Sequence, residues 1–203
     1  IQMILTSVLL ASFCLLSSAF DEVVTYGSVV KLQNVQEGSR LHSHEVKYGS
    51  GSGQQSVTGV RTSDDVNSHW TILAPLGSPT IRGEPVLCGG RIRLQHLKTE
   101  CFLHSHHFDA PLSKGSQEVS CFGSEKESDT GDHWDVVCSN DEWLEPESVR
   151  LQHVDTGAFL ALSGQQFGRP IQGQREVVGL PRESGSVSWR VAEGVLMGRN
   201  KQE

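Results

Sequence analysis

Long apolar runs are absent from this sequence except within its first twenty residues. Residues 1–20 contain no Asp, Glu, Lys or Arg, and an apolar run over 8–16 is followed by Ser17, Ser18 and Ala19. Small side chains three and one positions before a cut after Ala19 are typical of a secretory signal peptide. A membrane anchor is the alternative, but a bilayer-spanning helix requires roughly 20 apolar residues. We therefore expect a signal peptide over 1–19, a single domain over 20–203 and no membrane span after cleavage.

Clusters of basic residues are also missing. The chain has 17 Lys and Arg against 24 Asp and Glu, which gives a formal net charge of −7. A nucleic-acid partner requires Lys and Arg gathered on one face, where they neutralise phosphates. We therefore expect no nucleic-acid partner.

Sequence signatures of catalysis are absent too. No Gly-x-Ser-x-Gly nucleophile elbow stands between a strand and a helix. The glycine-rich run 49–53 lacks the Gly-Lys-Ser/Thr ending of a phosphate loop, and we interpret it as a hairpin loop in which glycine permits positive φ. The acidic pairs Asp64-Asp65 and Asp141-Glu142 are interpreted as solvated loop charges. We expect no catalytic residue, no cofactor and no enzyme, with convergent acids in a pocket as the alternative.

What the sequence does contain is one unit repeated three times, at intervals of about sixty residues. Alternating apolar positions predict a first strand at 29–34, 92–96 and 149–153. Second strands follow at 40–44, 102–106 and 159–163, then loops rich in Gly, Pro and Ser. Third strands are predicted at 55–59, 117–120 and 175–179. Fourth strands begin at Trp70, Trp134 and Trp189, which we expect to anchor the core.

Three such units predict an all-β fold, a β-trefoil with pseudo-three-fold symmetry, because one unit alone cannot cover its apolar face. A propeller-like arrangement is the alternative. We expect the repeats at about 22–76, 83–139 and 140–194, with a short tail over 195–203.

Four cysteines lie outside the expected signal peptide, and none forms a Cys-x-x-Cys motif. An even number in an oxidising compartment favours disulfides. Strand phase places Cys88 and Cys138 on the first and last strands of one unit, and this pair is preferred. Cys101 and Cys121 face the same side of neighbouring strands and form the second candidate pair. Two buried free thiols are the competing interpretation of the second pair.

Several motifs in this chain resemble the stromal cell-derived factor 2 family. They are Arg-Leu-His-Ser-His at 40–44, the glycine-rich stretch 48–59, Leu-His-Ser-His at 103–106, Gln-Glu-Val-Ser-Cys-Phe-Gly at 117–123, Gly-Asp-His-Trp at 131–134 and Arg-Leu-Gln-His at 150–153. The similarity covers residues 20–203 almost completely, and each repeat is similar to a MIR motif. The resemblance implies a trefoil of three MIR repeats in the lumen of the endoplasmic reticulum.

The resemblance further implies a role in protein folding quality control and the unfolded-protein response. The expected partners are a luminal J-domain co-chaperone, the chaperone BiP and unfolded or misfolded clients, with a link to protein O-mannosyltransferases or glycans. The tail, 198–203, carries no retrieval tetrapeptide, so retention through a partner and secretion both stay open. A lectin-like module that reads a glycan is the alternative function.

The candidate binding residues lie on the second strands and in the loops that follow them: His42, His44, Tyr48, Gly51, Gly53, His104, His106 and Phe167. Residues two apart on a strand share a face, so each His pair offers two imidazoles. A zinc site usually requires three or four protein ligands, and the third repeat has Ala161 and Ser163 at the His positions. We therefore expect structural or ligand-contacting histidines and no metal site.

Overall fold

The computed structural model of the chain describes residues 22–183 and 185–200, and the expected signal peptide over 1–19 lies outside this part. The described fold is all-β, with short 3-10 turns as its helical elements. The strands are β1 Glu22–Val23, β2 Val29–Asn34, β3 Arg40–Lys47, β4 Gln55–Val60, β5 Trp70–Leu73, β6 Arg91–His96, β7 Phe102–Asp109, β8 Gln117–Phe122, β9 Trp134–Val137, β10 Leu144–Glu145, β11 Arg150–His153, β12 Phe159–Gln166, β13 Arg175–Leu180 and β14 Trp189–Val195.

Twelve of these strands fall into three groups of four that share one pattern. In β3, β7 and β12 the first four residues are buried and the last three are exposed, and in β4, β8 and β13 the middle four residues are buried. A 3-10 turn precedes the fourth strand of each group: η1 Val66–Ser68, η2 Thr130–Asp132 and η3 Gly185–Val187. The expected first, second, third and fourth strands are therefore all present.

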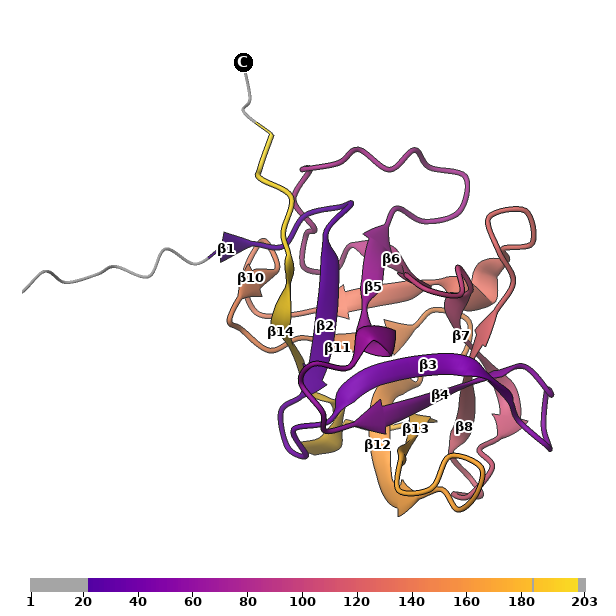
Figure 1. Ribbon diagram of the computed structural model, residues 1–203. Helices are drawn as coiled ribbons and strands as arrows, with labels where there is room; N and C mark the ends of the chain where they lie inside the picture. The colour runs from indigo at the N-terminus through magenta and orange to yellow at the C-terminus, as the bar shows by residue number, and fades with distance from the viewer. Residues whose placement is uncertain (1–21, 184, 201–203) are drawn as a thin grey trace, which may run out of the picture.

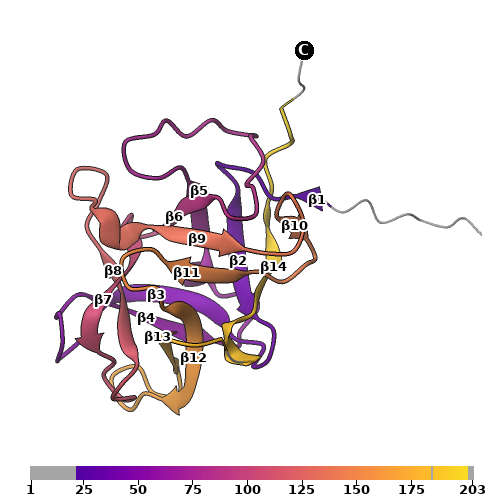
Figure 2. The ribbon, with the colours of Figure 1, turned by 180° about the vertical axis from the view of Figure 1, so that it is seen from behind.

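Six strands form a ring, the barrel that occupies the upper half of Figure 1 and appears from behind in Figure 2. In order around the ring, β2 pairs with β5, β5 with β6, β6 with β9 and β9 with β11. A bridge between Val149 and Trp189 links the start of β11 to β14, and β14 pairs with β2. This closure leaves few unpaired strand edges.

The three remaining hairpins, β3–β4, β7–β8 and β12–β13, cover one end of the ring. Strand β4 pairs with both β8 and β13, and β8 also pairs with β13, so the hairpins meet around a common centre. The first strand of each hairpin, β3, β7 or β12, contacts the 3-10 turn of its own group.

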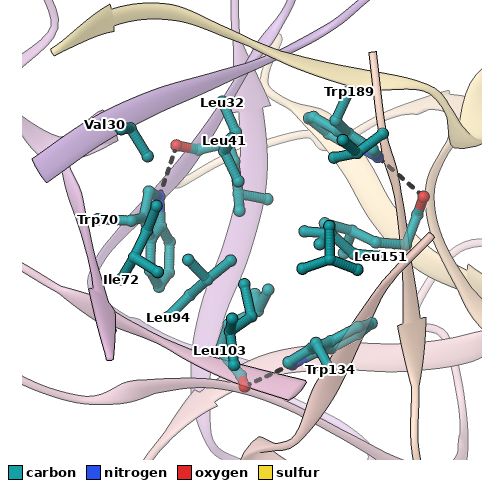
Figure 3. Close-up of a cluster of buried hydrophobic side chains, with 14 of the residues drawn as sticks. Val30, Leu32, Leu41, Trp70, Ile72, Leu94, Leu103, Trp134, Leu151 and Trp189 are labelled. Atoms are coloured by element: carbon teal, nitrogen blue, oxygen red, sulfur yellow. Dashed lines mark hydrogen bonds between the residues drawn. The ribbon is translucent and has the colours of Figure 1, made fainter. Parts of the chain in front are cut away.

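Three tryptophans fix the core that the ring and the hairpins enclose. Trp70, Trp134 and Trp189 are fully buried, as expected from the sequence. Their indole Nε1 atoms donate to the backbone oxygens of Leu41, Leu103 and Leu160 at 2.9, 2.9 and 2.8 Å, and Figure 3 shows these bonds around the cluster. Each indole thus joins the fourth strand of a group to its second strand while its ring fills the core.

A fourth tryptophan, Trp143, was not singled out by the repeat because it lies in a connecting segment. It is fully buried, its backbone N–H donates to Val86, and its backbone oxygen accepts from Val24. Its Nε1 atom has no hydrogen-bond partner. The indole N–H groups of the three repeated tryptophans therefore each make a hydrogen bond, whereas that of Trp143 makes none.

Two disulfides connect the four cysteines in the pairs that strand phase favoured. Cys88 is bonded to Cys138 with a Cα–Cα distance of 5.3 Å, and Cys101 is bonded to Cys121 with a distance of 5.4 Å. Free thiols, the alternative for the second pair, are absent from these positions. Cys101 and Cys121 are buried, whereas Cys88 and Cys138 are half-buried.

The Trp134→Phe variant should lose more stability than Trp143→Phe. Both substitutions remove a similar volume from the core, but only Trp134 donates from Nε1. Because the net contribution of a typical hydrogen bond is about 0.5–1.5 kcal/mol, we expect the free energy of unfolding to fall by about 1 kcal/mol more at Trp134. Urea unfolding of both variants measures this difference. An equal or larger loss at Trp143 would contradict the role given to the indole bond.

Reduction under native conditions should open Cys88–Cys138 before Cys101–Cys121. Exchange requires a thiolate to reach a sulfur atom, and the sulfurs of the second pair are enclosed by the core cluster. Timed alkylation after addition of dithiothreitol, followed by peptide mass analysis, reports which cysteines become free. Simultaneous alkylation of all four, in protein that stays folded, would show that burial does not protect the inner pair.

Candidate functional site

The first candidate site is the place where β3 passes the turn η1. His42 Nδ1 lies 2.8 Å from Asp65 Oδ2, and Ser68 Oγ donates to the same oxygen at 2.6 Å. Asp65 is therefore not the solvated loop charge that the sequence suggested, because the turn directs its carboxylate inward onto a buried imidazole. The Nε2 atom of His42 is buried and has no hydrogen-bond partner.

The same place in the second group carries one more carboxylate. His104 Nδ1 lies 3.0 Å from Asp132 Oδ1 and 3.6 Å from Asp129 Oδ1. Asp132 is fully buried, while the side chain of Asp129 is 58% exposed. The three ligand atoms all lie within 4.8 Å of one another, so this group could hold a metal ion. The expectation of no metal site was based on the number of histidines alone. With the two carboxylates of the turn, this place offers three possible ligands.

The third group has no polar pair at this place. Ala161 stands where His42 and His104 stand in the other groups, and it belongs with Val187 to a small apolar cluster. Val187 occupies the position of Ser68 and Asp132, two residues before the repeated tryptophan. The third group therefore lacks both polar residues, the histidine of the second strand and the polar residue of the 3-10 turn, and has apolar residues in their place. We call the contact between the second strand and the turn the junction.

Behind each junction, the last residue of the first strand supports the 3-10 turn. His96 Nε2 lies 2.9 Å from Asn67 O, His153 Nε2 lies 2.9 Å from Gly131 O, and Asn34 Nδ2 donates to Ser186 O at 2.6 Å. The His96 and His153 rings also lie against Trp70 and Trp134, with centroids 5.0 and 4.9 Å apart. These are structural histidines, and at the turn η3 of the third group the equivalent bond comes from Asn34 of the first group.

Burial controls the protonation of these imidazoles. It lowers the pKa of His96 to about 4, and it lowers the pKa of His153 as well. Burial also lowers the pKa of His42, although the neighbouring Asp65 acts in the opposite direction. For Asp65, burial opposes ionisation, but hydrogen bonds from Ser68 and His42 outweigh it and the pKa of the carboxyl group falls. At neutral pH, Asp65 is thus a carboxylate that accepts a hydrogen bond from a neutral His42.

The second histidine of each pair lines a hollow on the surface. His44 Nε2 lies 3.1 Å from Gln174 Oε1, and His106 Nε2 lies 3.2 Å from Glu118 Oε1. A hollow of about 340 Å³ is lined by His44, Glu45, Val46, Asn67, Lys98 and Thr99. A related hollow of about 300 Å³ is lined by residues that include His104, His106, His107, Asp129, Asp155 and Thr156. Each hollow thus lies between two neighbouring groups of strands.

The two aromatic loop candidates, Tyr48 and Phe167, differ in exposure, and the structure corrects the expectation for Tyr48. The sequence suggested Tyr48 as a stacking face for a ligand, but its side chain is buried and its hydroxyl lies within hydrogen-bond distance of two backbone oxygens, those of Val57 and Val119, at 3.0 and 2.9 Å. Burial also raises the pKa of this hydroxyl. Phe167 is half-buried, with its ring centroid 6.2 Å from that of Tyr48. Tyr48 therefore ties the hairpins together and is not available to a ligand.

Gly51 and Gly53 both have positive φ, at 63° and 66°, as the hairpin-loop interpretation requires. A Cβ atom on Gly51 would meet the carboxylate of Glu118, whereas Gly53 faces open space. Glu118 is fully buried and accepts from the backbone N–H and the hydroxyl of Ser52. Gly51 thus permits the carboxylate of the next group to hold this loop.

Within residues 22–183 and 185–200, no helical segment has the length and apolar character that a membrane span requires. A model of the MIR domain matches residues 23–183. Human stromal cell-derived factor 2 is 51% identical over 175 residues, which cover 86% of this chain and 82% of the human protein. The chain belongs to the stromal cell-derived factor 2 family. Two disulfides fit a protein of this family in the secretory pathway.

Two solved structures extend this comparison. The stromal cell-derived factor 2-like protein of Arabidopsis thaliana is 44% identical, with a TM-score of 0.85 over 88% of this chain and 99% of that chain. A protein O-mannosyltransferase complex of S. cerevisiae, bound to its sugar donor, contains a chain 25% identical with a TM-score of 0.77. That likeness covers 92% of this chain and 28% of the transferase chain.

The candidate site residues that the sequence of this family member did not indicate are the carboxylates beside the 3-10 turns. Asp65 and Asp129 each lie five positions before a repeated tryptophan, and Asp132 lies two positions before one. An alignment of the three units on their tryptophans places Asp65 and Asp129 at the same position of the repeat. Their pairing with His42 and His104 depends on hairpin placement, which the alignment does not contain.

Acidification should destabilise the protein through His96. Its folded-state pKa is about 4 and its ordinary value is 6.5, so below pH 6.5 the unfolded chain binds a proton that the folded chain does not. Stability is therefore lost as the pH falls from 6.5 toward 4. We expect His96→Asn, which copies Asn34, to reduce the loss of unfolding free energy between pH 7.5 and pH 5 by about 2 kcal/mol.

Urea unfolding at the two pH values measures this change, and His153→Asn, at the same place in the next group, should act in the same direction. Identical pH dependence in the wild-type protein and in both variants would contradict the assignment of buried, neutral imidazoles.

Proposed function

We propose that this protein is a non-enzymatic adaptor of the endoplasmic reticulum lumen. It binds unfolded or misfolded clients and works in folding quality control with a J-domain co-chaperone and BiP. Membership of the stromal cell-derived factor 2 family supports the setting, and two disulfides suit the compartment. We further propose that the three groups of strands are three MIR repeats of one β-trefoil, at about 22–76, 83–139 and 140–194.

Client binding is proposed from four exposed apolar side chains at or next to the residues that line the two hollows, here called the rim. The rim consists of Val46, Val66, Leu97 and Phe108, all of which are exposed, with Val66 at 66% and Phe108 at 53%. Val46 lines the first hollow, and the other three are sequence neighbours of residues that line one of the two. An unfolded client differs from a folded protein in its exposed apolar side chains, and covering them with this rim is favourable.

Removal of the rim is the direct test of client binding. We expect the double variant Val66→Ser, Leu97→Ser to weaken binding of a fluorescent, reduced and unfolded polypeptide by about tenfold or more, because each fully covered aliphatic side chain contributes roughly 1.5 kcal/mol. Leu76→Ser, Ile81→Ser is the matched control, since both residues are exposed but lie in another loop. Equal weakening by both double variants, or by neither, would count against the rim.

Partner binding needs a separate measurement. The protein is purified from a luminal extract and the bound proteins are identified, with the expectation that BiP and a J-domain protein are among them. An extract that contains both chaperones but yields neither with the bait would refute the adaptor role while leaving the client result intact.

A lectin-like module is the second candidate, and the lining of the hollows favours it. Imidazole, hydroxyl and carboxylate groups converge there, at His44 and Thr99 in one hollow and at His106, Asp129 and Thr156 in the other. The likeness to a chain of a protein O-mannosyltransferase complex points in the same direction. We propose His44, His104 and His106 as contacts, with His42 behind them and Phe167 and Gly53 at the neighbouring loops. Silence on a glycan array, together with client binding, would reject this candidate.

A further inference from the structure

We propose that the second group of strands binds one divalent transition-metal ion, zinc, through His104 Nδ1, Asp129 and Asp132. The imidazole nitrogen lies 3.0 Å from Asp132 Oδ1 and 3.6 Å from Asp129 Oδ1. Zinc bonds of about 2.0–2.1 Å in a tetrahedron place neighbouring ligand atoms about 3.3 Å apart. Both distances already lie within a few tenths of an ångström of that value, so the ion requires only small shifts of the three side chains.

The turn that supplies the two carboxylates also orients them. Asp129 Oδ1 accepts from Gly131 N at 2.8 Å, and Asp132 Oδ2 accepts from Ser128 Oγ at 2.7 Å and Asp129 N at 3.2 Å. These bonds leave Asp132 Oδ1 directed at His104 and leave Asp129 Oδ2 free of those contacts. Fixed carboxylates of this kind lower the cost of ordering ligands around an ion.

Charge and access both suit a cation at this place. Asp132 is a fully buried acid, and Asp129 and Asp155 both line the hollow of about 300 Å³. Buried acidic side chains are favourable when they are paired or coordinate a metal. The exposed side chain of Asp129 borders the hollow, so an ion can enter from solvent and keep its fourth position for water or a ligand in the hollow.

The ligand set favours zinc over calcium or magnesium. Imidazole suits zinc and its neighbours in the transition series, whereas calcium takes six to eight oxygen ligands and magnesium keeps most of its water. Three protein ligands with an open fourth position are the usual arrangement of a non-structural zinc site.

The other two groups provide the internal comparison. The first has His42 and Asp65 at the places of His104 and Asp129, but Ser68 replaces Asp132 and only two ligands remain. In the third group, Ala161 and Val187 offer no ligand. The proposal therefore specifies one ion per chain, at one of three related places.

Titration of the full mature chain with Zn²⁺ by calorimetry tests the site. We expect one ion per chain, and Co²⁺ bound at the same site should give the intense visible absorption of tetrahedral coordination. Asp129→Asn keeps the acceptor for Gly131 N but removes a charged ligand. Because loss of even an outer-shell partner costs 10–100-fold in metal affinity, we expect this variant to bind Zn²⁺ at least about tenfold more weakly.

Asp65→Asn is the matched control, since it makes the same substitution at the same place in the group with two ligands. It should leave zinc affinity and stoichiometry unchanged, and circular dichroism of both variants confirms that they are folded. Wild-type affinity in Asp129→Asn, equal weakening in Asp65→Asn, or a wild-type protein without a stoichiometric site would each overturn the proposal. None of these outcomes bears on client or chaperone binding.

Discussion

The structure depends on three indole hydrogen bonds made inside a closed ring of strands. In each group, Trp70, Trp134 or Trp189 starts the fourth strand and donates to the backbone oxygen at the second residue of the hairpin's first strand. An indole ring buries a large apolar area and also requires a partner for its N–H group. A carbonyl at one fixed place on the hairpin satisfies that requirement, so the same side chain that fills the core also sets the hairpin against the ring.

Once the hairpins are set in this way, the 3-10 turn before each tryptophan is brought against the second strand. The residue two positions before the tryptophan then faces the residue after the bonded carbonyl. Two groups place polar residues there and the third places Ala161 and Val187. A buried ionic pair is often no more stabilising than well-packed apolar residues of similar volume. The apolar version in the third group shows that the fold accepts either kind of junction.

Two of the three hairpin loops are held by a carboxylate from the next group. Glu118 accepts from Ser52 in the first loop, and Glu176 accepts from Leu112 N and Ser113 Oγ in the second. The corresponding residue of β4 is Ser56, which bonds to Val46 instead. The third loop, which carries Phe167, therefore lacks this carboxylate clamp. The three groups share one scaffold and differ in junction chemistry and in how their loops are fixed.

By itself, the sequence determined the strands, their grouping, the buried repeated tryptophans, the disulfide partners and the family. These follow from spacing and alternation, which are local properties of a chain that repeats one unit three times. Only the tertiary structure decided that Asp65, Asp129 and Asp132 meet histidines, that Tyr48 is buried between hairpins, and that Trp143 joins the core. Those outcomes depend on contacts between segments far apart in the chain. The periodicity of a sequence indicates which face of a strand is buried, but it does not indicate which turn lies against which hairpin.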